Sequence, residues 1–163
     1  MKTLYLVRHA SASIDAPTKK DIDRPLNHAG ISEAEIMAAF LRKQDAKIDQ
    51  IISSPARRAI VTSQIIAKHF FYQLQEINVE EVIFLNDIEK ILPFIYSMDN
   101  SIENILFVGH NPSVSILASL ISAEPVPLFK PAGIACIEFE IEMWNEVSKK
   151  GTLKFYADPS LIT

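Results

Sequence analysis

Arginine and histidine side chains follow three apolar runs of the sequence, at the points where the chain leaves each run. They are Arg8 and His9 after residues 3–7, Arg57 and Arg58 after residues 48–53, and His110 with Asn111 after residues 105–108. A guanidinium group is a permanently charged, planar donor that matches the oxygens of phosphate. An imidazole can be neutral at about pH 7 and can then attack phosphorus as a nucleophile. Several such cations around one neutral imidazole would bind a phosphoryl group and stabilise the charge on its oxygens.

These polar groups can meet only if the three apolar runs are parallel strands of one sheet. The first run, Thr3–Val7, is rich in apolar and aromatic residues, which is typical of a strand buried on both faces. Ligands of open α/β sheets bind at the carboxyl ends of the strands. A lone histidine there, such as His9 or His110, is more often a hydrogen-bonded structural residue than a catalyst. Matching chemistry at three strand ends favours a shared phosphoryl site.

Strands alternate with helices along most of the chain. The apolar periods predict helices at 28–44, 55–70, 88–98 and 112–121, a loop at 11–25, and strands at 3–7, 48–53, 78–84, 105–108, 134–141 and 152–156. We expect one domain over residues 1–163, with an α/β fold of three layers, α/β/α. Its sheet would be mainly parallel, with helices on both faces and an antiparallel edge near the C-terminus.

Three details of this pattern concern helix ends and the core. Asn27 precedes the first helix and is suited to cap it. Trp144 lies in a turn region, where we expect it to be partly buried. One face of the first helix is apolar and should pack on the sheet; it carries Ile31, Ala34, Met37, Ala38 and Leu41.

The composition is that of a globular protein without a strong overall charge. The chain has 163 residues, 48% of them hydrophobic, and a net charge of −4, which gives no general attraction to nucleic acid or to an anionic membrane. The single cysteine, Cys136, cannot form an internal disulfide and suits a reducing compartment. The apolar stretch before Arg8 is shorter than the roughly 7–15 residues of a secretory signal. We therefore expect a cytoplasmic protein that binds neither nucleic acid nor membranes.

Other catalytic patterns are missing from the sequence. A cysteine phosphatase needs an arginine shortly after its cysteine, but no arginine follows Cys136, which we interpret as a core thiol. The four glycines are too scattered for a phosphate-binding loop or a dinucleotide fingerprint. His9 and His110 lack the further ligands that a zinc site needs, and His28 and His69 fall on helices as surface residues. We expect no metal and no cofactor.

Three segments taken together resemble the histidine phosphatase superfamily. They are Leu6-Val7-Arg8-His9-Ala10, Ser53-Ser54-Pro55-Ala56-Arg57-Arg58-Ala59 with Thr62, and Val108-Gly109-His110-Asn111-Pro112. The short chain, the Arg-His-Ala start and the segment Asp23-Arg24-Pro25-Leu26-Asn27-His28-Ala29-Gly30 resemble the SixA-type phosphohistidine phosphatases within it. The resemblance runs in order from Leu4 to the region of Pro112 and implies a phosphoglycerate mutase-like fold.

The resemblance also implies a role for each residue of the site. His9 would be the nucleophile that takes the phosphoryl group as a covalent phosphohistidine, without a metal, and water would then release phosphate. Arg8, Arg58 and His110 would bind the phosphoryl group. In the family's Ser-Pro-x-x-Arg-Ala pattern the arginine falls at Arg58, which makes Arg57 the weaker choice.

Two further residues are expected to contact the substrate. Arg24 matches a family position near the pocket, although an ion pair with Asp21 or Asp23 would explain it equally well. Asn111, directly after the second histidine, is expected to bind substrate too.

The proton donor for the leaving group is not evident. Superfamily members that cleave phosphate esters carry an acidic residue for this purpose, and this chain has Asn86 in the corresponding region. Asp87 or Glu89 could serve, but Asp87 is better explained as the acidic residue that begins a helix. A missing acid favours a phosphoramidate, so we expect a phosphohistidine phosphatase acting on a phosphorylated protein, for example a histidine phosphotransfer domain. A small phosphomonoesterase and a non-catalytic phosphoprotein-binding module are the alternatives.

Overall fold

A computed structural model describes residues 1–162, and within these residues the chain forms one six-stranded sheet. The strands are β1 (Lys2–Arg8), β2 (Gln50–Ser53), β3 (Asn78–Val79), β4 (Asn104–Gly109), β5 (Ile134–Phe139) and β6 (Thr152–Ala157). Their order across the sheet is β3-β2-β4-β1-β5-β6. The first four of these strands are parallel, whereas β5 is antiparallel to β1 and to β6. The predicted sheet, mainly parallel with an antiparallel C-terminal edge, is confirmed.

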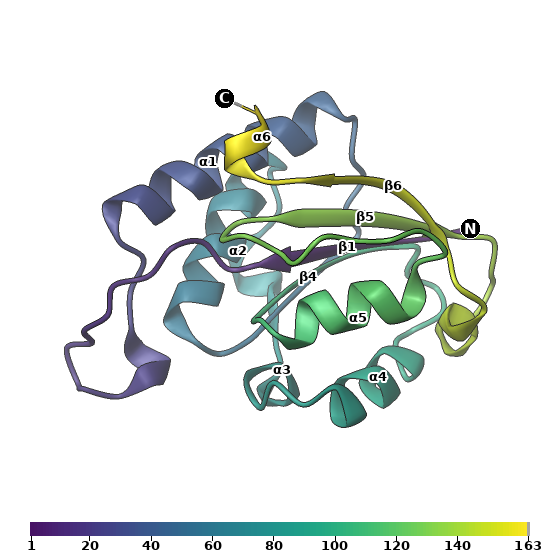
Figure 1. Ribbon diagram of the computed structural model, residues 1–163, viewed down its shortest axis with the longest axis horizontal. Coiled ribbons are helices and arrows are strands. Elements are labelled where there is room, and N and C mark those ends of the chain that lie inside the picture. Colours follow the sequence, from purple (N-terminus) through teal and green to yellow (C-terminus); the bar gives the residue numbers. More distant parts are fainter. Residues whose placement is uncertain (163) are drawn as a thin grey trace.

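Helices cover both faces of this sheet (Figure 1). The helices are α1 (His28–Lys43), α2 (Arg57–His69), α3 (Glu81–Phe84), α4 (Ile88–Tyr96), α5 (Ser113–Ile121) and α6 (Pro159–Ile162), and short 3₁₀ turns are η1 (Asp21–Asp23), η2 (Leu74–Glu76) and η3 (Trp144–Lys149). Successive side chains of a strand point to opposite faces. Leu4 and Leu6 of β1 therefore enter the core beneath α4 and α5, and Tyr5 and Val7 enter the core beneath α1 and α2. The α/β/α layering is confirmed.

The N-terminus of α1 is fixed against the loop that follows β1. Asn27 caps the helix, since its side chain accepts a hydrogen bond of 2.8 Å from the Gly30 amide. A Cβ atom on Gly30 would lie 2.0 Å from the carbonyl oxygen of Ser11, so the close approach requires glycine. The buried stripe of α1 consequently begins at Gly30, and the prediction that Ile31 belongs to it is wrong, because Ile31 is 45% exposed.

Two other predictions are corrected by the packing of the chain. The expected strand at 78–84 is a strand only at Asn78–Val79, and α3 follows it. The helical turn lets Ile83 enter the core and brings Phe84 against His110, which an extended edge strand would not do. Trp144 is fully buried and not partly so, because its indole N–H finds a partner in the Ile102 carbonyl oxygen at 3.0 Å.

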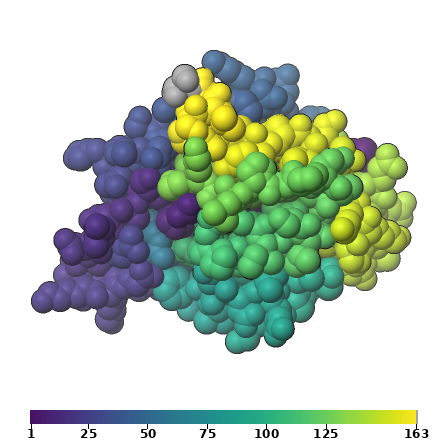
Figure 2. Space-filling model, in the orientation of Figure 1, coloured from purple at the N-terminus to yellow at the C-terminus, as the bar shows by residue number. Residues whose placement is uncertain are grey.

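The segment between β1 and α1 stands out from the body of the molecule at the end of the sheet where β1 finishes (Figure 2). It carries η1, and its two ends are joined by a bridge between Ala12 and Leu26. This segment places Asp21 and Arg24 beside the carboxyl ends of the parallel strands. Within residues 1–162 no helix is long and apolar enough to cross a membrane.

Candidate active site

The carboxyl ends of β1, β2 and β4 bring the two histidines together, as the sequence predicts. β4 lies between the other two strands, and the backbone continues their pairing past the strand ends: the His9 amide donates to the Gly109 carbonyl at 3.1 Å, and the Ser54 amide to the Val108 carbonyl at 3.1 Å. The ring centres of His9 and His110 are 5.1 Å apart. A pocket of about 270 Å³ opens here, lined by Arg8, His9, Asp21, Arg24, Arg58, Phe84, Asn86, His110 and Asn111.

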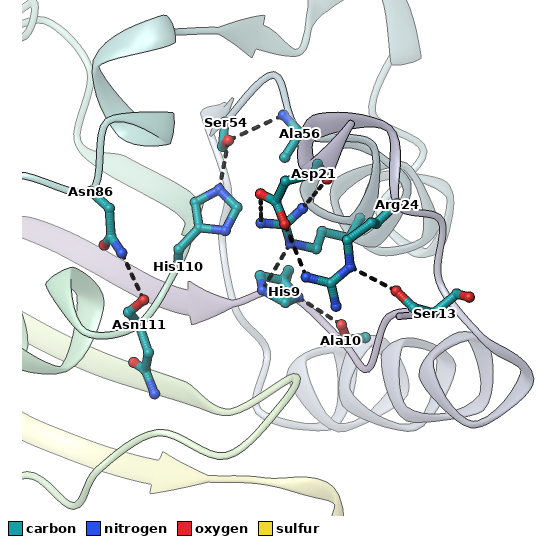
Figure 3. A network of polar contacts seen from close by, with 11 residues as sticks. His9, Ala10, Ser13, Asp21, Arg24, Ser54, Ala56, Asn86, His110 and Asn111 are labelled. Carbon is teal, nitrogen blue, oxygen red and sulfur yellow. Dashed lines mark hydrogen bonds and ion pairs between the residues drawn. The ribbon is translucent and has the colours of Figure 1, made fainter. Parts of the chain in front are cut away.

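His9 presents an unprotonated nitrogen to this pocket. Its Nδ1 atom lies 2.7 Å from the carbonyl oxygen of Ala10 (Figure 3). A carbonyl oxygen only accepts, so Nδ1 carries the proton and Nε2 keeps its lone pair. Arg58 Nε donates to that Nε2 atom at 3.3 Å. Burial, reinforced by the charges of Arg58 and Arg8 and opposed by the Ala10 hydrogen bond, lowers the pKa of His9 to about 4. The imidazole is therefore neutral at neutral pH.

Arg58 is the arginine of α2 that reaches the pocket. Its side chain is 8% exposed, and it donates from Nη1 to the carbonyl oxygen of Asp21 at 2.9 Å and from Nη2 to the Asp21 carboxylate at 3.1 Å. Thr62, one turn along α2, accepts from the Ala10 amide at 3.1 Å and donates to the Arg58 carbonyl at 2.7 Å, which fixes the helix against the His9 loop. Arg57 is exposed and is not among the residues that line the pocket, in agreement with the choice of Arg58.

Arg8 also lines the pocket and contacts the segment before β5. Its Nη1 donates to the carbonyl oxygen of Phe129 at 2.9 Å. Its Nε is buried and has no hydrogen-bond partner among residues 1–162. The same carbonyl oxygen of Phe129 accepts from Asn111 Nδ2 at 2.9 Å. One backbone carbonyl thus positions two residues of the pocket.

His110 is oriented by a serine that the sequence motifs do not assign a role. The Nε2 atom of His110 lies 2.7 Å from Ser54 Oγ, and that oxygen accepts from the Ala56 amide at 3.2 Å. The Ser54 hydroxyl can donate its hydrogen to Nε2, an arrangement that would place the proton of the ring on Nδ1. That Nδ1 atom is buried without a hydrogen-bond partner among the described residues. Burial, with the nearby His9 and Arg58, lowers the pKa of His110 to about 3.

The ion pair expected of Arg24 is present, and substrate binding by Arg24 stays a prediction. It lines the pocket, and its Nη1 atom forms an ion pair of 3.0 Å with the Asp21 carboxylate, while its Nε donates to the Ser13 carbonyl at 2.7 Å. Hydrogen bonds from Arg24 and Arg58 hold the pKa of Asp21 below its usual value. Nothing in the sequence marked Asp21 as a pocket residue beyond its position three residues before Arg24.

Asn111 and Asn86 lie together at the edge of the pocket under α3. Asn86 Nδ2 donates to the Asn111 carbonyl at 2.8 Å, and its Oδ1 accepts from the Ser113 amide at 3.1 Å. The side-chain oxygen of Asn111 accepts from Ser115 Oγ at 2.6 Å. Both amides thus hold the loop that follows β4 in place, and substrate binding by Asn111 stays a prediction.

The two carboxylates considered as proton donors lie elsewhere. Asp87 caps α4 by accepting a hydrogen bond of 3.0 Å from the Glu89 amide, as its expected place at a helix start requires. Neither residue is among those that line the pocket in the described part of the chain. Over residues 1–162 no three side chains of histidine, cysteine, aspartate or glutamate are grouped so as to hold a metal ion.

Comparison with known proteins agrees with this geometry. Residues 4–83 match the histidine phosphatase superfamily (branch 1). The chain is 26% identical to the phosphohistidine phosphatase SixA of Escherichia coli (strain K12) over 139 residues, which cover 84% of this chain and 85% of that protein. Among solved structures, SixA complexed with tungstate superposes with a TM-score of 0.84 at 23% identity, over 99% of both chains. A protein of Agrobacterium tumefaciens, solved as a candidate phosphohistidine phosphatase SixA, gives 0.80 at 26% identity, over 97% of this chain and 98% of that one. The chain thus belongs to the histidine phosphatase superfamily, whose members are phosphatases, and is of the SixA type within it.

Proposed function

We propose that this phosphatase removes the phosphoryl group from a phosphohistidine side chain of another protein, with His9 as the nucleophile, and that residues 1–163 act as one domain. The observation that carries the proposal is the unprotonated Nε2 atom of His9, which lies in a pocket lined by three arginines and a second imidazole. The SixA relative of Escherichia coli, a phosphohistidine phosphatase, supports the substrate. A structural relative that binds tungstate, a tetrahedral oxyanion like phosphate, supports the binding mode.

The phosphoryl oxygens would enter among the N–H groups of Arg8, Arg24 and Arg58. With Ser54 donating to Nε2 of His110, the buried Nδ1 of that ring would carry a hydrogen and donate it to a further oxygen. Arg58 Nε–H, which donates to His9 Nε2 in this structure, would turn to the phosphoryl group. The loss of this hydrogen bond frees the lone pair for attack.

His9 Nε2 would then form a bond to phosphorus while the bond to the leaving nitrogen breaks and its electron pair stays on that nitrogen. The proton on Nδ1 remains there, held by the Ala10 carbonyl, so the phosphorylated ring is cationic. Water attacks phosphorus next, the bond to Nε2 breaks, its electron pair returns to the ring, and phosphate leaves with both protons of the water. Guanidinium and imidazole N–H groups stabilise the transferring oxygens in this scheme, which calls for no metal ion.

The pocket is small and has room for a phosphoryl group and the ring that carries it. Its volume is about 270 Å³, and its lining is almost entirely polar, with Phe84 as the apolar exception. Most of any substrate would therefore lie outside the pocket, on the protein surface. This arrangement favours a phosphorylated side chain of a protein, such as that of a histidine phosphotransfer domain, over a small metabolite.

The nucleophile is tested by trapping the intermediate. Brief incubation with a phosphohistidine peptide, followed by quenching, should leave acid-labile and base-stable phosphate on His9, located by mass spectrometry. His9→Ala should abolish both the trapped phosphate and turnover. The exposed His28 provides the matched control, since His28→Ala removes an imidazole outside the pocket. Turnover by His9→Ala at the original rate would refute the mechanism.

The substrate is tested by comparing kcat/KM for a phosphohistidine peptide, a phosphoserine peptide and sugar phosphates. We expect the phosphohistidine peptide to be preferred. A preference for the esters would identify a small phosphomonoesterase instead. Tight binding of the phosphopeptide without turnover would identify a binding module.

A further inference from the structure

Asp21 is the one carboxylate among the described residues that line the pocket. Its Oδ2 atom accepts from Arg58 Nη2 at 3.1 Å and its Oδ1 atom from Arg24 Nη1 at 3.0 Å, while its carbonyl oxygen accepts from Arg58 Nη1 at 2.9 Å. The Asp21 carboxylate thus accepts hydrogen bonds from the guanidinium groups of Arg24 and Arg58, which we propose bind phosphate. An anionic substrate must compete with the Asp21 carboxylate for these guanidinium N–H groups.

The carboxylate lies on the solvent side of the phosphate-binding groups. The Asp21 side chain is 56% exposed, whereas that of Arg58 beneath it is 8% exposed. Figure 3 shows Asp21 and Arg24 side by side next to His9. A phosphorylated side chain must enter from solvent, so its leaving group would lie toward the Asp21 side after the phosphoryl oxygens reach the arginines. The phosphoryl group takes over the arginine donors, and Asp21 loses its partners at that moment.

We propose that Asp21 then accepts a hydrogen bond from the ring N–H of the departing imidazole, and so selects phosphohistidine over phosphate esters. The inference rests on the proposed function and adds a specificity residue to it. A phosphohistidine ring that carries a proton on its second nitrogen leaves as a neutral imidazole when the bond to phosphorus breaks. The electron pair of that bond goes to the leaving nitrogen, the proton stays on the other nitrogen, and Asp21 remains ionised throughout.

An alcohol leaving group gains nothing from this arrangement. It departs as an alkoxide unless an acid protonates it, and Asp21, which is ionised in its arginine contacts before substrate binds, brings no proton to that step. The side chain in the region where ester-cleaving relatives carry an acid is Asn86, which holds the loop after β4. The negative charge of Asp21 also repels substrates with a carboxylate or a second phosphate near the reacting group. Both effects favour a substrate whose ring is cationic before its bond to phosphorus breaks.

The competing explanation is that Asp21 only positions Arg58. The two explanations differ in what they predict for different substrates. If Asp21 recognises the leaving ring, its replacement should reduce hydrolysis of phosphohistidine more than that of an ester. If it only positions Arg58, both reactions should fall together and oxyanion binding should weaken, since Arg58 serves every phosphoryl substrate.

The test uses the full chain with Asp21→Asn and Asp21→Ala, and Asp23→Asn as the matched control. Asp23 lies in the same turn η1 but contacts Thr18 and does not line the pocket. The measurements are kcat/KM for a phosphohistidine peptide and for p-nitrophenyl phosphate, inhibition by orthovanadate, and urea unfolding to establish that each variant folds. We expect the ratio of phosphohistidine to ester hydrolysis to fall by about tenfold or more in both Asp21 variants, which corresponds to one lost hydrogen bond to a charged group. Orthovanadate should bind at least as tightly as before.

An unchanged ratio with weaker orthovanadate binding would overturn the inference and assign Asp21 to the positioning of Arg58. A ratio that falls equally in Asp23→Asn would overturn it as well, because the effect would then belong to the turn and not to the pocket carboxylate. Failure of the proposed function looks different. In that case the unsubstituted protein would already prefer the ester, before any change at Asp21.

Discussion

Acidification from about pH 7.5 to about pH 5 should destabilise this protein through the two histidines of its pocket. Burial holds the pKa of His9 at about 4 and that of His110 at about 3, against 6.5 for an ordinary histidine. When the pH falls below 6.5, His9 and His110 bind a proton in the unfolded chain but stay unprotonated in the native protein until the pH approaches their lowered pKa values. The unfolded state is therefore favoured as the pH falls.

The magnitude follows from the three pKa values. At about pH 5 an unfolded histidine is almost fully charged, whereas His9 and His110 remain mostly neutral in the native state. Each residue then lowers the free energy of unfolding by about 2 kcal/mol relative to about pH 7.5. This value is RT times the logarithm of the ratio between the proton-binding polynomial of the histidine in the unfolded state and that in the native state. The two together should cost about 4 kcal/mol, a large part of the stability of a typical domain.

Urea unfolding at the two pH values measures this loss directly, and single substitutions isolate each residue. His9→Gln and His110→Gln should each reduce the pH-dependent loss by about 2 kcal/mol, because the unfolded state then has one fewer site to protonate. His28→Gln, which removes an exposed imidazole outside the pocket, is the matched control. The groups that are unchanged between the unsubstituted protein and the three variants contribute equally to the pH dependence of each, so their contributions cancel in the comparison.

A pH-dependent loss in His9→Gln equal to that of the unsubstituted protein would refute the reasoning. His9 would then be protonated in the native state at about pH 5, and it could not be a neutral nucleophile of lowered pKa. The same result would remove the argument that its Nε2 lone pair is available at every pH above about 5.

Three further outcomes are expected. Arg58→Ala should lower kcat/KM by about 100-fold or more, because a donor to the transferring oxygens is lost, whereas the exposed Arg57→Ala should change it by less than about threefold; equal effects would contradict the assignment of Arg58. Ser54→Ala should lower kcat/KM by about tenfold and the free energy of unfolding by about 1–3 kcal/mol, since the Ala56 amide and His110 Nε2 lose their partner; unchanged kinetics would show that Ser54 does not set the proton position. Gly30→Ala should destabilise the fold by about 1–3 kcal/mol in thermal unfolding, because the added Cβ would meet the Ser11 carbonyl at 2.0 Å; an unaltered Tm would contradict that close approach.

Local sequence patterns were sufficient for most of the fold. The apolar runs of β1 and β4 have buried side chains on both faces, which only a sheet covered by helices on each side can satisfy. The ends of these apolar runs predict where the strands end, at Arg8, Ser53 and Gly109. Parallel strands that end there bring His9 and His110 together. The pattern failed at 78–84, because an apolar run of that length suits an edge strand and a helical turn equally well. Packing of Ile83 into the core decided between them.

Burial and periodicity are local properties of the chain, so the sequence predicts which strands carry the arginines and histidines and at which edge of the sheet these side chains lie. The hydrogen bonds that hold these side chains in place are visible only in the folded protein. The Asp21 carboxylate on Arg58, the Ser54 hydroxyl on His110 and the Phe129 carbonyl on Arg8 join residues 37, 56 and 121 positions apart. No periodicity encodes such pairs, because hydrogen bonds between distant residues depend on how separately folded segments meet. Burial in the folded protein also lowers the pKa of both histidines and keeps His9, the proposed nucleophile, neutral.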